Sequence, residues 1–131
     1  MAAQVSMDGF EIRIKDQILE MRTEGMRTAS MGRDPERVFE SLTRSAPVKA
    51  VLFDVREAHY VLDATKWEER ARVVARMCRD FTCAFIIRPD QTEQVEVLTA
   101  LHRGYGAVSA HFRSRSQARV WLKERISEMA G

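Results

Sequence analysis

The sequence predicts a single α/β domain with a mixed five-stranded sheet, in the element order β-β-α-β-α-β-α-β-α, and helices packed on that sheet. Three observations predict this class. The 131 residues are 45% hydrophobic with only six glycines and three prolines, a composition typical of one globular domain. Short apolar runs alternate with segments of helical period, an order that requires parallel strands joined by right-handed crossovers. Two adjacent segments before them can pair as an antiparallel hairpin. We assign residues 10–131 to the domain and residues 1–9 to an N-terminal tail.

The first two elements are predicted as paired strands. Residues 10–14 alternate apolar and polar side chains with the period of a half-buried strand. Residues 15–17 can turn the chain, and residues 18–23 then read as a second strand. The same segment would also suit a short helix ended by Gly25. The strand is preferred because the first strand would otherwise have no neighbour, and the helical alternative stays open.

A helix and a buried strand come next. Residues 26–32 form a polar connector, and Asp34 followed by Pro35 is a capping residue with proline in the first helical position. This helix ends before Pro47. Residues 48–55 hold a nearly continuous apolar run, the pattern of a strand covered on both faces.

The second helix follows a predicted loop over residues 56–63 and begins near Thr65. Residues 83–87 are predicted as another buried strand, stopped by Pro89. The helix is predicted because apolar residues recur on one face with helical spacing, at Trp67, Ala71, Val74, Ala75 and Cys78.

The last third of the chain supplies one more strand between two helices. Asp90 and Glu93 resemble a capping box that opens a helix, which residues 104–106 end. Residues 107–112 are predicted as the last strand, and Ser114 with a glutamine three residues later caps the final helix. The apolar stripe of that helix is Ala118, Trp121, Leu122, Ile126 and Met129.

Charge and hydropathy exclude several classes of protein. A net charge of +2 is too small to make nucleic acid or a membrane surface the expected partner. Residues 102–131 carry six Lys/Arg against two Glu, a local charge of +4 that we interpret as a solvated helix face. No apolar stretch approaches the roughly 18 residues of a membrane span. Because residues 1–9 lack a basic start followed by an apolar run, we expect no signal peptide and a cytoplasmic location.

No cofactor, metal site or catalytic machinery is predicted. Cys78 and Cys83 do not have the spacing of a zinc or redox motif and are expected to be reduced. His59, His102 and His111 are scattered, and none has a nucleophile or carboxylate partner at motif spacing. The sequence therefore predicts a protein that is not an enzyme, although catalytic groups assembled from distant loops are a third alternative.

The strand ending in Asp54-Val55 and the step Asp63-Ala64-Thr65 resemble the STAS family of anti-sigma-factor antagonists. Residues 108–122 are similar to the final strand and helix of the SpoIIAA-like branch, which itself resembles the lipid-carrying CRAL-TRIO domains. The resemblance covers residues 10–128. It implies a bacterial cytosolic protein-interaction module whose partner is a protein, an anti-sigma factor or kinase.

In the signalling members of that family, the second hydroxyl residue of the step is phosphorylated, and by position this residue is Thr65. A phosphate at a helix N-terminus meets free N–H groups and the positive end of the helix dipole. The sequence departs from the family pattern, with Ala64 in place of the first serine and Lys66 in place of the glycine. Thr65 also opens an S/T-x-x-E capping box with Glu68, and Asp63 is an alternative cap that would leave the Thr65 hydroxyl exposed.

The predicted docking surface comprises Asp54, His59, Tyr60, Asp63 and Lys66, with Thr65 as a candidate switch. In α/β domains, the loops at the carboxyl edge of the sheet are the usual binding region. The structural alternative for His59-Tyr60 is a tyrosine packed on the sheet edge with its hydroxyl in water. Self-association through a sheet edge, giving a homodimer, is compatible with this prediction.

A second hypothesis is a small domain that binds an apolar or anionic ligand, as the lipid-carrier side of the resemblance implies. The pocket would lie between the sheet and the helices that carry Trp67 and Val95. Methionine adapts to varied apolar shapes, and four methionines of the N-terminal third are candidates to line the pocket. They are Met7, Met21, Met26 and Met31.

Overall fold

A computed structural model of the chain describes residues 4–7, 9–28 and 34–130. Its strands are β1 (Gln4–Met7), β2 (Phe10–Lys15), β3 (Ile18–Thr28), β4 (Ala50–Val61), β5 (Thr82–Ile86) and β6 (Ser109–Phe112). Its helices are α1 (Asp34–Ser45), α2 (Ala64–Met77), α3 (Thr92–Gly104) and α4 (Arg115–Ala130), with a 3-10 turn, η1 (Pro89–Gln91), before α3. None of the helices described is long and apolar enough to cross a membrane.

The sheet is mixed, and its spatial order β1-β2-β3-β4-β5-β6 follows the chain. The first three strands pair antiparallel, and β3 to β6 pair parallel. The predicted α/β class is therefore confirmed. The predicted strand count is wrong, because residues 4–7, assigned to a tail, form a strand on β2. Gly9, with φ +77°, occupies the left-handed region at the turn between β1 and β2, where glycine is favoured.

Residues 18–23, for which a short helix was the alternative, belong to a strand, β3. Asp16 and Gln17 both take positive φ, at 56° and 64°, and this two-residue turn matches the twist of the paired strands. β3 then continues to Thr28, so residues 26–28 of the predicted polar connector belong to the strand. Its parallel pairing with β4 over this stretch supplies hydrogen bonds that local sequence does not reveal. Residues 29–32 of the predicted connector lie outside the described residues.

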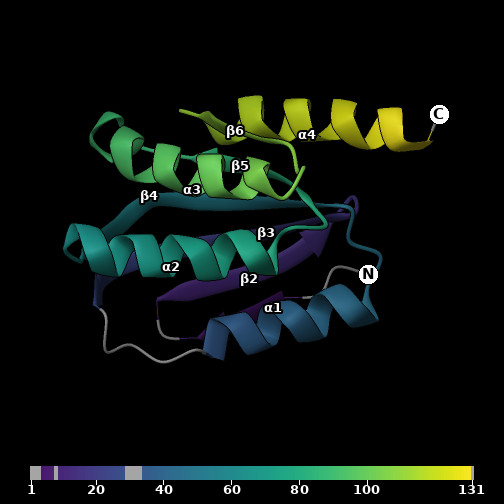
Figure 1. The fold of residues 1–131 in the computed structure, drawn as a ribbon. Helices are drawn as coiled ribbons and strands as arrows, with labels where there is room; N and C mark the ends of the chain where they lie inside the picture. The colour runs from purple at the N-terminus through teal and green to yellow at the C-terminus, as the bar shows by residue number, and fades with distance from the viewer. Residues whose placement is uncertain (1–3, 8, 29–33, 131) are drawn as a thin grey trace.

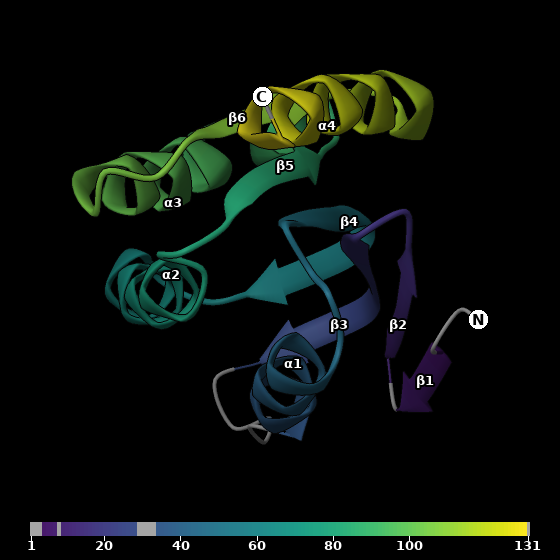
Figure 2. The ribbon, with the colours of Figure 1, turned by 90° about the vertical axis from the view of Figure 1, so that its right-hand side faces the viewer.

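Helices cover the two faces of the sheet unequally. Figures 1 and 2 show α1, α2 and α3 on one face, with α4 on the other. The larger core lies under the first three helices and includes Leu19, Val51 and Phe53. Ile18 and Leu52, which alternate with these residues along the strands, pack with Leu122 beneath α4.

β4 runs well beyond its predicted end, and the predicted loop over residues 56–63 is wrong for residues 56–61. The pairing of β3 with β4 shifts register between Arg22 and Glu24, a β-bulge. Distant side chains bind carbonyl groups of β4 at this bulge and just after it. Gln91 Nε2 donates to the carbonyls of Val55 at 2.7 Å and of Ala58 at 3.2 Å. The Arg88 guanidinium donates to the Arg56 and Ala58 carbonyls.

The helix boundaries agree with prediction except in their caps. Asp90 does not cap α3, because Pro89–Gln91 form the 3-10 turn and the Asp90 carboxylate instead pairs with Arg88 at 3.0 Å. Ser114 caps α4 as predicted, its hydroxyl accepting a hydrogen bond from the Gln117 N–H at 3.2 Å. The predicted stripe of α4 does not extend to Met129, which is 49% exposed because the helix projects past the sheet.

Candidate functional site

The N-terminus of α2 confirms one of the two predicted caps. The helix begins at Ala64, and Asp63 Oδ1 accepts a hydrogen bond from the Lys66 N–H at 2.8 Å. Thr65 is therefore the second helical residue and does not cap the helix through the predicted box with Glu68. Its side chain is exposed, as is that of Lys66, which pairs with Glu69.

The predicted docking residues do not form one surface. Asp54 lies within β4 and lines the face opposite α2, where its carboxylate binds the Arg56 guanidinium at 2.8 and 3.0 Å. Burial raises the pKa of Asp54, but the hydrogen bonds and charge of Arg56 outweigh it, and the net pKa is lowered. His59 is exposed on β4 beside Met26 of β3. Asp54 was predicted at the strand end, and the longer β4 places it several residues before that end.

Tyr60 packs beneath α2 and not at a solvent-facing edge. Its ring meets the Trp67 ring edge-on, with centroids 5.0 Å apart. Burial raises the pKa of the Tyr60 hydroxyl, while Arg70, Arg27 and a hydrogen bond with Thr23 act in the opposite direction. The hydroxyl therefore stays protonated near neutral pH and can donate a hydrogen bond.

Tyr60 and Trp67 belong to the lining of a pocket between the sheet and α1, α2 and α3, which we call the helix-layer pocket. Its cavity volume is about 80 Å³. The sheet supplies an apolar floor in which the rings of Phe53 and Phe85 stack with centroids 5.2 Å apart. Side chains of the helices supply the apolar walls: Pro35, Trp67, Ala71, Val74, Met77, Val95 and Leu98.

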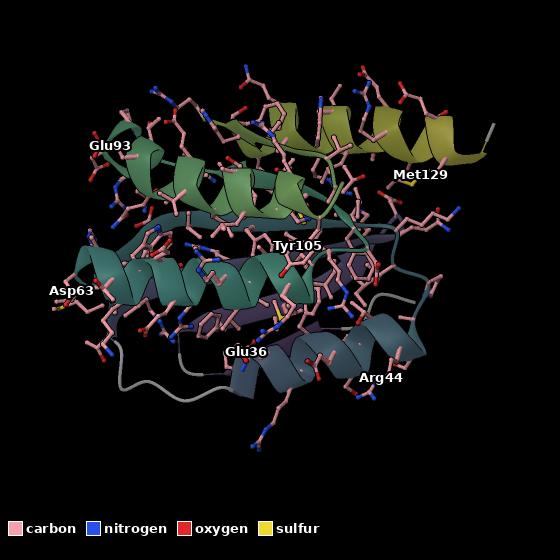
Figure 3. All side chains as sticks on the ribbon, viewed as in Figure 1. Glu36, Arg44, Asp63, Glu93, Tyr105 and Met129 are labelled. Atoms are coloured by element: carbon pink, nitrogen blue, oxygen red, sulfur yellow. The ribbon has the colours of Figure 1, made fainter. Side chains whose placement is uncertain are left out.

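The polar residues of this pocket include two arginines and one carboxylate. Arg27 reaches the pocket from β3 and places its guanidinium 4.2 Å from the centroid of the Phe10 ring. Arg70 lines it from α2, and Glu36 lines it from the first turn of α1. Figure 3 shows Glu36 and Asp63 at the N-terminal ends of their helices, toward the same side of the molecule.

Trp67 joins the two helices that form most of the pocket wall. Its indole N–H donates to the Gln94 carbonyl of α3 at 2.9 Å, and its side chain is buried in the main core. The predicted place for a ligand pocket, beside the helices carrying Trp67 and Val95, therefore coincides with an observed cavity.

Only one of the four methionines proposed for the pocket is seen to line it. Met21 lines the floor, and Met26 is 63% exposed on β3. The side chain of Met7 and the whole of Met31 lie outside the described residues. Met77, at the end of α2, lines the pocket although it was not predicted to.

A second, charged concavity lies on the opposite face of the sheet, beside α4, and we call it the open-face basin. It has a volume of about 460 Å³ and is lined by Glu11, Arg13, Glu20, Arg22, Asp54, Arg56, Glu57 and Arg115. Glu20 ties α4 to the sheet, because it accepts hydrogen bonds from Arg115 at 2.5 and 2.8 Å and from Arg119 at 3.4 Å. Glu20 and Asp54, two carboxylates of this basin, already bind arginines, so we interpret the basin as a structural ion-pair network.

The two cysteines are free and buried, beside a buried histidine. His102 Nε2 lies 2.9 Å from the Cys78 carbonyl and 3.7 Å from Cys83 Sγ. Burial lowers the pKa of His102, which keeps its ring neutral at pH 7. Among the described residues, no group of three or more His, Cys, Asp or Glu side chains is arranged to hold a metal ion.

Comparison with protein-family models gives no match, and comparison with curated proteins gives none. A solved structure is similar: an uncharacterized protein from the DUF3478 family with a SpoIIAA-like fold, from Shewanella loihica PV-4. It aligns with 92% of this chain and 93% of its own, with a TM-score of 0.55 and 16% identity. The chain therefore has a SpoIIAA-like fold, which confirms the fold that the resemblance implied. Similarity at this level of identity concerns fold alone.

Proposed function

We propose that this domain is a non-enzymatic binding module whose helix-layer pocket holds a small molecule with an apolar portion. The observation that carries the proposal is the pocket itself, with its stacked phenylalanine floor and its walls of aliphatic side chains from three helices. A concave, mostly apolar site with a few polar groups is the usual form of a small-molecule site.

The size of the cavity limits the ligand. An apolar cavity of about 150 Å³ holds benzene, so a cavity of about 80 Å³ admits a short chain or the end of a longer one. Burial of four CH₂ groups contributes roughly 3 kcal/mol, and a millimolar Kd corresponds to about 4 kcal/mol. Short-chain probes are therefore expected to bind in the millimolar range, which NMR titration measures well.

Filling the pocket should abolish this binding. Val74 lines the pocket from α2, and we expect Val74→Trp to occupy the cavity with its indole. Titration of 1-hexanol into ¹⁵N-labelled protein should shift amide resonances of α2, α3 and the sheet in the unmodified chain and leave those of Val74→Trp unchanged.

Val120→Trp on α4 is the matched control, because Val120 is 58% exposed and does not line the pocket. This variant should bind 1-hexanol like the unmodified chain. Equal binding of 1-hexanol by both variants would contradict the proposal. So would the absence of shifts in the unmodified chain with 1-hexanol and with its anionic analogues, hexanoate and hexyl phosphate. Thermal unfolding of each variant separates a blocked pocket from a damaged fold.

A second candidate function is protein docking at the N-terminus of α2, switched by phosphorylation of Thr65 with an anti-sigma factor or kinase as partner. The exposed side chain of Thr65 favours this candidate, because Asp63 caps α2 and the Thr65 hydroxyl is not used as the cap. Incubation with candidate kinases and ATP should add the mass of one phosphate to the unmodified chain and none to Thr65→Val. Unchanged mass with every kinase, or modification of the Val variant at another residue, would argue against this candidate.

A further inference from the structure

Two arginines and two hydroxyl residues line the helix-layer pocket together: Arg27, Arg70, Thr23 and Tyr60. The positive charges of Arg70 and Arg27 and a hydrogen bond with Thr23 act to lower the pKa of the Tyr60 hydroxyl, against the larger effect of burial. The four residues come from three different elements, β3, β4 and α2, so the fold and not a local motif brings them together.

The described lining of the pocket carries a net positive charge. Two guanidinium groups line the cavity, and among the described lining residues Glu36 is the only carboxylate. The arginines of α2 differ in how they are paired. Arg72, on the outer surface, binds Glu68 at 3.0 Å, whereas no described carboxylate lies within ion-pair distance of Arg70, which is half-buried. A half-buried cation that lines an apolar cavity is stabilised by an anion that enters with the ligand.

From this arrangement we infer that the ligand of the helix-layer pocket carries an anionic head group, bound by Arg70 and Arg27 while its chain enters the apolar cavity. The inference rests on the proposed function and adds the chemical class of the ligand. A guanidinium can donate two parallel hydrogen bonds to a carboxylate or phosphate. The Tyr60 and Thr23 hydroxyls share one hydrogen bond, which leaves one hydroxyl proton of the pair to donate to the head group. The ligand is therefore an amphiphilic anion and not a neutral apolar compound.

Three probes with the same six-carbon chain test the inference: hexanoate, hexyl phosphate and 1-hexanol. At pH 7, the unmodified chain should bind at least one of the two anions about tenfold or more tightly than 1-hexanol, the usual gain from a charge-assisted contact. The anion that binds more tightly shows whether the head group of the ligand is a carboxylate or a phosphate. NMR titration of amide resonances in α2 and the sheet measures all three affinities.

Removal of single charges assigns the effect to residues. Arg70→Gln should weaken anion binding about tenfold and leave 1-hexanol binding unchanged. Arg72→Gln, two residues along the same helix and outside the pocket, loses the same charge and should bind all three probes normally. Arg27→Gln should weaken anion binding as Arg70→Gln does.

The outcomes separate the two proposals. If 1-hexanol binds and both anions bind no more tightly, the inference of an anionic head group is wrong and the pocket still binds apolar compounds. Equal loss of anion binding in Arg70→Gln and Arg72→Gln would also overturn the inference, because the effect would then come from net charge alone. If no probe shifts the pocket resonances, the proposed function itself fails.

Discussion

Replacing Trp67 by alanine is expected to lower the free energy of unfolding by about 3–5 kcal/mol, the usual cost of deleting a buried tryptophan. The substitution removes an 8%-exposed side chain from the main core. It also deletes the edge-on contact with Tyr60 and the hydrogen bond to the Gln94 carbonyl that joins α2 to α3. Urea unfolding followed by circular dichroism measures the change.

Trp121→Ala is the matched control on α4. Trp121 is half-buried, and its ring centroid lies 5.5 Å from that of Phe112. Its indole donates no hydrogen bond to the described residues. We expect it to cost only about 1–2 kcal/mol. A similar cost for both tryptophans would mean that Trp67 does not hold α2 and α3 together as described.

The second large effect concerns Glu20, the buried carboxylate that fixes α4 to β3. Glu20→Gln removes the charge from hydrogen bonds with Arg115 and Arg119, and Arg119 is only 11% exposed in its side chain. Because hydrogen bonds to charged groups contribute about 1.5–3 kcal/mol, we expect a loss of roughly 2–3 kcal/mol at pH 7. Glu69→Gln, in which the carboxylate is 62% exposed, should cost little.

The contribution of Glu20 should also depend on pH, with a definite sign. Burial raises its pKa, but the hydrogen bond and charge of Arg115 and the charges of Arg13 and Arg119 outweigh burial and lower it below 4.5. The unfolded chain therefore takes up a proton first, so the stabilisation is complete above pH 4.5 and is lost as the pH falls through the lowered pKa. Urea unfolding from pH 7 to pH 3 should show the curves of the unmodified chain and Glu20→Gln converging. A constant gap would contradict the assigned pairing.

The local sequence pattern predicted those helices and strands whose own residues carry a clear apolar periodicity. The spacing of Trp67, Ala71 and Ala75 places one apolar face on α2, and these residues are buried as that face requires. Features that depend on distant residues were missed. β1 is short and is held by pairing with β2, and the extension of β4 past Asp54 is held by pairing with β3 and by the side chains of Arg88 and Gln91.

The candidate site shows the same division. Tyr60 was proposed as a contact residue because it follows an apolar strand. The bulge in β4 determines on which face of the sheet the Tyr60 side chain lies, and the sequence does not reveal this bulge. Arg27 and Arg70 lie far apart in sequence and at no common spacing, so nothing indicated that they line one pocket with Tyr60. The sequence contains one indication of this site: Arg70 lies in α2, the helix whose apolar face was predicted.

Occupation of the helix-layer pocket is tested most directly by intermolecular NOEs between the terminal methyl group of hexanoate and the labelled protein. Val95 and Leu98 line the inner wall of this pocket from α3. The structure predicts NOEs from the hexanoate methyl protons to the methyl groups of these two residues and to the Trp67 ring. NOEs confined to surface residues of α4 such as Val120, or their absence at saturating hexanoate, would contradict ligand binding in this pocket.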